Sequence, residues 1–174
     1  MPKASQLLQR RMAVRSLVFI LSIGLLAGCA TGISRKARNT VTYHGTFSDL
    51  HQHPADGIGK TVLLGGKIIA VTTRENFTEL AVLQLALDAF NRVQDNDHSE
   101  GRFLIVSHTF LDPAIYKKGD RITVVGRVTG TENRLIGQHP YRYLTIAPTE
   151  IRHEPPDPVI SPRIRFGFGF GATF

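Results

Sequence analysis

Short runs of alternating hydrophobic and polar residues, separated by polar turns, fill the middle of the chain. The runs are rich in β-branched residues, a pattern typical of strands that bury one face. The run over 77–87 contains enough Leu and Ala for a helix, but the alternation around Leu80 and Val82 and the polar turn before it favour a hairpin with the preceding strand. Five strands are therefore predicted, over residues 60–72, 77–87, 101–107, 120–130 and 141–151.

Two short segments between these runs have helical signals. Residues 47–50, followed by Pro54, predict one helical turn before the first strand. Between the third and fourth strands, Asp112 is a good N-cap, Pro113 suits the first helical position and Gly119 suits the position after the end. A short helix is therefore predicted over 110–119.

Three strands, a short helix and two further strands are the element order of an OB-fold barrel. We therefore predict an all-β fold with one short helix, built as a small OB-like five-stranded barrel. Gly65 and Gly66 predict a bulge or sharp bend in the first strand, and Gly126 breaks the fourth, as closure of so small a barrel requires. An open β-sandwich or meander is the main alternative.

The first 28 residues predict a targeting segment. Basic residues without an acidic one precede an apolar run over 17–26, which is the order of a secretory signal peptide. The run is too short to cross a membrane comfortably, because a spanning helix needs about 20 apolar residues. An uncleaved amino-terminal anchor is one alternative, and a start at Met12 is another. The basic residues are Lys3, Arg10, Arg11 and Arg15.

The apolar run ends in Leu26-Ala27-Gly28-Cys29, which resembles the lipobox of bacterial lipoproteins. A cysteine is required there because its thiolate is nucleophilic enough to accept a diacylglyceryl group as a thioether. Cleavage is predicted between Gly28 and Cys29, and the resemblance implies three acyl chains on Cys29. Ala30 follows instead of the aspartate that usually retains such proteins at the inner membrane, so outer-membrane placement is predicted. A free or buried cysteine placed there by chance is the alternative.

Composition limits the partners and the chemistry. The chain has 174 residues and a single cysteine, so an intramolecular disulfide is impossible, and the paired Cys/His spacing of a structural zinc site is absent. Removal of residues 1–28 takes four positive charges away and lowers the formal net charge from +7 to +3. A nucleic-acid partner therefore loses most of its support. The mean hydropathy of -0.05 argues against a wholly disordered chain and a polytopic membrane protein alike.

Four parts follow from these patterns: a lipoprotein signal peptide over 1–28, a lipidated flexible tether over 29–45, an OB-like domain over 46–153, and a Pro-rich spacer with a Phe/Gly tail over 154–174. The tether is polar and basic, and Arg35, Lys36 and Arg38 either lie near phospholipid headgroups or are solvated linker charges.

The tail ends in RIRFGFGFGATF, where alternating aromatic residues fall on one face of an extended chain. Four aromatic rings on one face require a surface to cover them, so we predict contact with a membrane or a partner. A flexible Gly-rich end is the alternative. The predicted contact residues are Phe166, Phe168, Phe170 and Phe174.

The candidates for catalysis are few. His51 and His53 form an H-x-H pair, but they precede Pro54 in a loop context and are interpreted as surface histidines. A Ser/His/Asp set could be drawn from residues 107, 108 and 112, yet no nucleophile elbow accompanies it. No phosphate-binding glycine loop or dinucleotide motif occurs. We therefore predict no catalytic residue, no metal site and no cofactor.

With the lipobox, the order of short motifs in the strands resembles the Slp family of starvation-inducible outer-membrane lipoproteins. The sequence departs from the family pattern at Ala86, where a proline is often seen, and in its tail, which has Phe where relatives tend to have Trp and Tyr. The matching positions lie between about 47 and 151: Gly59, 65–69, 78–80, 87–88, 101–103, 110–113, Tyr116 and 119–130.

The resemblance implies an outer-membrane lipoprotein linked to starvation or stationary-phase envelope stability, with no established enzymatic activity or cofactor. We therefore expect a non-enzymatic envelope protein, held at the outer membrane by its lipid, that binds the membrane or an envelope protein partner. The alternative is a periplasmic OB-like module that captures an oligosaccharide or a small solute on its barrel face. A hydrolase is a distant third reading.

Overall fold

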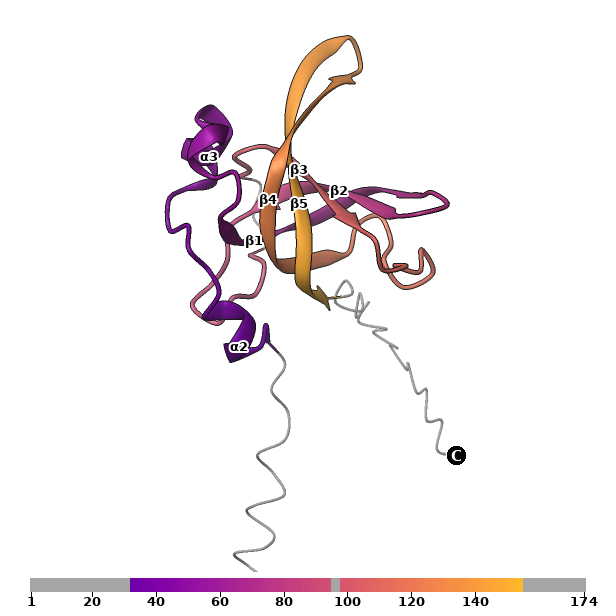
Figure 1. Ribbon diagram of the computed structural model, residues 1–174. Helices are drawn as coiled ribbons and strands as arrows, with labels where there is room; N and C mark the ends of the chain where they lie inside the picture. The colour runs from indigo at the N-terminus through magenta and orange to yellow at the C-terminus, as the bar shows by residue number, and fades with distance from the viewer. Residues whose placement is uncertain (1–31, 95–97, 155–174) are drawn as a thin grey trace, which may run out of the picture.

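The computed structural model describes residues 32–94 and 98–154. Five strands form a closed barrel in the order β1-β2-β3-β5-β4 (Figure 1). Parallel pairing of β3 with β5 closes it, with Phe103 opposite Leu144, and the other pairs are antiparallel. The predicted OB-like barrel is confirmed, and the open alternatives are excluded. The strands are β1 (Thr61–Thr73), β2 (Thr78–Leu85), β3 (Arg102–Ser107), β4 (Arg121–Ile136) and β5 (His139–Glu154).

The barrel interior is filled by the apolar residues that alternate along each strand. Phe103 on β3 is the largest of these side chains and is completely buried. Successive side chains of a strand point to opposite faces, so one residue in two enters the core. Closure leaves the sheet without free edges inside the barrel. The other core residues with no exposed surface include Ile68, Leu80, Val82, Ile105, Ile122, Val124, Val128 and Ile146.

The bulge in β1 is not at its glycine pair, as the sequence predicted. Gly65 and Gly66 keep regular register with β2, and the irregularity falls between Ile68 and Ala70. The glycines are needed for close approach instead, because a Cβ on Gly66 would lie 2.3 Å from the carbonyl oxygen of Leu83. The break predicted at Gly126 is confirmed, since the register of β4 with β5 shifts between Val125 and Gly126.

The helix predicted over 110–119 is absent. The N-cap contact forms, since the Ala114 amide donates to Asp112 Oδ1 at 2.8 Å, and one turn follows. The Lys117 amide then donates to Asp120 Oδ2 at 3.0 Å, so the chain turns into β4 instead of continuing as a helix. The short helical elements lie before the barrel: α2 (Arg35–Arg38), α3 (Phe47–Gln52) and η2 (Pro54–Asp56).

Helix α3 confirms the turn predicted at 47–50 and completes the core. Thr46 is its N-cap, with Oγ1 accepting from the Asp49 amide at 3.0 Å. Phe47 and Leu50 are buried in the barrel core, and the Phe47 and Phe103 ring centroids are 5.9 Å apart. The helix therefore covers core surface that the five strands leave open.

Strands β4 and β5 continue past the barrel as a projecting hairpin, which we call the arm (residues 131–142; Figure 1). The sequence predicted that this strand, β4, would end at 130, and the residues that follow it are mostly polar. Here the strands are specified by pairing with each other and by a tight turn, in which Gly137 has a φ of 62°. An alternating hydrophobic pattern is not needed where neither face is buried.

The close approach at Gly66 predicts a stability effect. We expect Gly66→Ala to lower the free energy of unfolding by about 1–3 kcal/mol, because its methyl group would collide with the backbone of β2. Gly32→Ala is the matched control, since its Cβ would meet nothing closer than 3.9 Å. Urea denaturation followed by circular dichroism measures both, and equal midpoints would show that β2 moves aside without cost.

Candidate functional site

The segment that leads into the barrel lies against its wall. The sequence predicted a flexible tether over 29–45, but Ile33 and Ala37 are buried on Val125, whose side chain is on the outer face of β4. Val41 and Leu63 complete this small apolar cluster. The described part of the predicted tether is therefore folded, because it covers apolar surface of the barrel that water would otherwise contact.

Ser34 fixes this segment to β5. Its amide and its hydroxyl donate to the two carboxylate oxygens of Glu150, each at 2.6 Å, while Ser34 Oγ accepts from the Ala37 amide as the N-cap of α2. Downstream, the Thr42 amide donates to the Thr61 carbonyl at 2.9 Å. Polar contacts thus hold both ends of the apolar cluster, and α2 presents three exposed basic residues, Arg35, Lys36 and Arg38.

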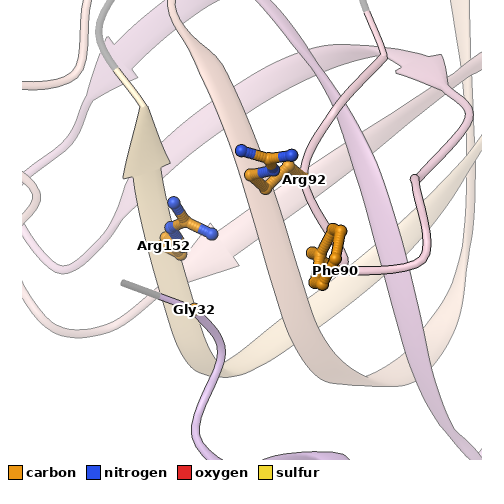
Figure 2. A pocket seen from close by; sticks show the side chains of 4 residues that line it. All are labelled: Gly32, Phe90, Arg92 and Arg152. Carbon is orange, nitrogen blue, oxygen red and sulfur yellow. The ribbon is translucent and has the colours of Figure 1, made fainter. Parts of the chain in front are cut away.

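A hollow of about 330 Å³ opens where the described chain begins, lined by Gly32, Phe90, Arg92 and Arg152 (Figure 2). We call it the basic hollow. Figure 2 shows the Arg152 side chain on the last strand, with its guanidinium group directed toward Arg92 and Phe90. Gly32 lies beside Arg152 in the same view.

The loop that carries Phe90 and Arg92 is firmly folded. Asp88 Oδ1 accepts from the amides of Phe90 and Arg92, both at 2.8 Å, and Asp88 Oδ2 accepts from Arg92 Nε at 3.0 Å. The Arg92 amide is the main cause that lowers the pKa of Asp88. On the barrel side, Thr123 Oγ1 donates to the Asn91 carbonyl at 3.0 Å. Phe90 and Arg92 are therefore held in place despite their exposure.

A second hollow, of about 510 Å³, lies between the β1–β2 turn and the arm, and we call it the arm cleft. Arg134 on the arm donates to both carboxylate oxygens of Glu79 on β2 at 2.6 Å, and its Nε donates to Glu132 at 2.7 Å. The hydrogen bonds to Glu79 raise the pKa of Arg134. Such a bidentate pair fixes geometry as well as charge. The cleft is lined by Thr72, Arg74, Phe77, Glu79, Val106, Glu132 and Arg134.

The weak catalytic candidates are engaged in separate structural contacts. Nε2 of His51 lies 2.8 Å from the Arg142 carbonyl, and His53 caps α3. Ser107 donates to the Thr109 carbonyl, and His108 lies 3.3 Å from the Asn76 carbonyl. Over residues 32–94 and 98–154, no group of three His, Cys, Asp or Glu side chains is placed to hold a metal ion.

One pair of titratable side chains was not anticipated from the sequence. His153 Nε2 and Asp120 Oδ2 are 2.6 Å apart, and the ring of Tyr116 packs edge-on against His153. The same carboxylate oxygen accepts from the Lys117 amide. The pair therefore joins the end of β5 to the turn before β4.

Cys29 and Gly28 lie outside the described residues, as do Phe166, Phe168, Phe170 and Phe174. Among the helices that are described, none is long and apolar enough to cross a membrane. Some of what sequence reasoning missed had a signal: Ser34 is a residue type suited to an N-cap, and the apolar residues Ile33 and Ala37 lie on either side of it.

A small closed barrel, preceded by a lipobox and by a segment fixed to the barrel wall, defines a class of lipid-anchored β-barrel domains. Residues 26–159 match the outer membrane lipoprotein Slp family, and the match begins at the lipobox. The chain therefore belongs to this family and is an outer-membrane lipoprotein. The family and the location predicted from the sequence are both confirmed.

Two relatives come from Escherichia coli K12. The chain is 29% identical over 125 residues to uncharacterized lipoprotein YeaY, covering 72% of this chain and 64% of that protein. It is 28% identical over 129 residues to outer membrane protein Slp, covering 73% and 68%. The similarity thus spans slightly less than two thirds of YeaY.

Among solved structures, a small single-stranded DNA-binding protein from Streptomyces coelicolor has a TM-score of 0.38 and 14% identity, with 54% of this chain and 93% of that chain covered. The mitochondrial single-stranded DNA-binding protein Rim1 from S. cerevisiae has a TM-score of 0.34 and 13% identity, with 56% and 97% covered. The assignment of the barrel rests on its own strand order.

The contact between Ser34 and Glu150 predicts local unfolding when it is removed. Hydrogen bonds to a charged group contribute about 1.5–3 kcal/mol, so we expect Glu150→Gln to increase amide exchange at Arg38 and Asn39 about tenfold or more. Exchange in the barrel strands should not change. Hydrogen–deuterium exchange measures this, with Glu132→Gln on the arm as control; unchanged exchange in α2 would show that the apolar cluster alone holds it.

Proposed function

We propose that the protein is a non-enzymatic lipoprotein, anchored by acyl chains on Cys29, that supports envelope stability or the response to starvation by binding the membrane or an envelope protein partner. The observation that carries the proposal is the sequence Leu26-Ala27-Gly28-Cys29, which places an acylatable thiol three residues before Gly32, where the described chain begins. Family membership supports it.

The proposal includes the division of the chain into its parts. Residues 1–28 are a signal peptide that is cleaved between Gly28 and Cys29, residues 46–153 are the OB-like domain, and residues 154–174 are a Pro-rich spacer with an aromatic tail. In the tail, Phe166, Phe168, Phe170 and Phe174 contact the partner or the membrane. A nucleic-acid partner does not belong to the proposal, since the net charge after cleavage is only +3. The proposal includes no cofactor.

The arm cleft favours a second candidate function, the binding of an oligosaccharide or small solute. Its volume of about 510 Å³ lies in the range of small-molecule sites. Arg74, Glu132 and Thr72 supply polar groups beside the ring of Phe77, the combination that orients a polar ligand against an apolar surface. The two candidates differ in whether function depends on the tail or on the cleft.

Anchoring through Cys29 is tested by labelling cells with radioactive palmitate. We expect Cys29→Ser to abolish the label and the recovery of the protein in the outer-membrane fraction, because a serine hydroxyl is too weak a nucleophile to be acylated there. Ala30→Ser is the matched control and should keep both. Retention of the outer-membrane location by Cys29→Ser would mean that the tail or an uncleaved amino terminus holds the protein.

The role of the tail is tested with two triple variants. Alanine at Phe166, Phe168 and Phe170 removes most of the aromatic surface, whereas leucine at the same positions keeps an apolar surface of similar size. We expect in-cell cross-linking to neighbouring envelope components to be lost with alanine and largely kept with leucine, at equal melting temperatures. Cross-links that survive in the alanine variant would favour the arm cleft.

A further inference from the structure

The described chain begins very close to the predicted lipid attachment point. Gly32 lies three residues after Cys29, and a fully extended chain spans at most about 3.3–3.6 Å for each residue, or about 11 Å in all. Release of α2 from the barrel would increase the distance between Cys29 and the barrel wall. That release would break the contacts of Ser34 with Glu150 and expose Ile33. The barrel wall around Gly32 therefore stays no farther from the acyl chains than about the thickness of the headgroup layer.

The surface beside Gly32 has the composition of a membrane interface. Phe90 is 71% exposed although its loop is firmly held, and the Arg92 guanidinium lies 5.4 Å from the centroid of its ring. An aromatic ring with adjacent cations suits the boundary between headgroups and acyl chains. Guanidinium groups also match the geometry of phosphate oxygens, and two of them line the basic hollow.

Among the described residues that line or contact this surface, basic side chains outnumber acidic ones. Asp88 bonds Arg92 through Nε. Glu154 lies 3.3 Å from Arg152 Nη1, but its Oε1 makes no hydrogen bond in the described structure. Glu150 is occupied by Ser34. These three acidic residues stand against five basic ones, namely Arg35, Lys36, Arg38, Arg92 and Arg152.

We propose that the basic hollow and Phe90 form a membrane-docking surface, in which Arg92 and Arg152 bind the phosphate of a phospholipid headgroup and Phe90 enters the headgroup layer. The proposal rests on acylation of Cys29. It orients the molecule, because α2 and the arm lie at opposite ends of it (Figure 1), so that the arm points away from the membrane.

Site-specific labelling tests this orientation in the full lipidated protein, reconstituted into vesicles that contain phosphatidylglycerol. Cys29 is the only cysteine and is acylated, so an introduced thiol is the only free one. Phe90→Cys carries a fluorescent label at the docking surface. Leu135→Cys is the matched control on the arm, where Leu135 is also an exposed apolar residue, at 65%.

We expect the label at position 90 to be shielded from a water-soluble quencher and quenched by nitroxide lipids, and the label at 135 to behave in the opposite way. In neutral detergent micelles both labels should be accessible. Equal accessibility in vesicles would overturn the proposal, as would shielding of both labels in detergent, which would indicate self-association. Mass spectrometry of the same samples separates the docking proposal from the proposal that Cys29 is acylated. If Cys29 is acylated but position 90 is exposed, only the docking proposal fails. If Cys29 is not acylated, both proposals fail.

The arginines are tested with Arg92→Gln and Arg152→Gln in the Phe90→Cys background. Each basic residue near an anionic surface contributes enough attraction to change the ratio of docked to undocked protein about fivefold. Each substitution should therefore lower the ratio of shielded to exposed label at position 90 by about that factor. Arg74→Gln, at the exposed β1–β2 turn, is the control and should leave the ratio unchanged. Shielding that is insensitive to both arginines would overturn their role in phosphate binding.

Discussion

Parallel pairing of β3 with β5 is the constraint on which the rest of the molecule depends. It brings Phe103 beside Leu144 and turns an open sheet into a barrel with a single interior. The outer wall is then left to short segments: α2 covers Val125, and the loop around Asn91 bonds Thr123. The basic hollow forms where such additions meet the barrel wall, whereas the arm cleft forms where β4 and β5 continue past the barrel beside the β1–β2 turn.

The strands were predictable where one face is buried. Core residues such as Leu80 and Val82 alternate with less buried ones, and this period is visible in the sequence. The arm was not predictable, because its strands are specified by pairing across Gly137 and by the contact of Arg134 with Glu79, which are 55 residues apart. The helix predicted over 110–119 from local capping signals is wrong, because Asp112 caps only a single turn and Asp120 ends it.

The candidate sites also divide into features that a local sequence motif predicts and features that depend on distant residues. The lipobox is a local motif of adjacent residues, and together with the order of short motifs in the strands it was enough to infer the family. The basic hollow joins Gly32, the loop at Phe90 and the end of β5, and no sequence period connects three such distant segments. The basic residues of α2 were noticed, but their fixed position was not, because it depends on the carboxylate of Glu150 on a distant strand.

The arm is held from two sides. Arg134 is bonded to β2 through Glu79, and Arg142 donates to the His51 carbonyl of α3 at 3.0 Å. Its six paired positions beyond residue 130 correspond to roughly 20 Å of strand. Because these contacts already order the arm, binding of a partner to its tip would cost little conformational entropy. In the docking orientation proposed above, the arm therefore holds its tip at a fixed distance from the bilayer.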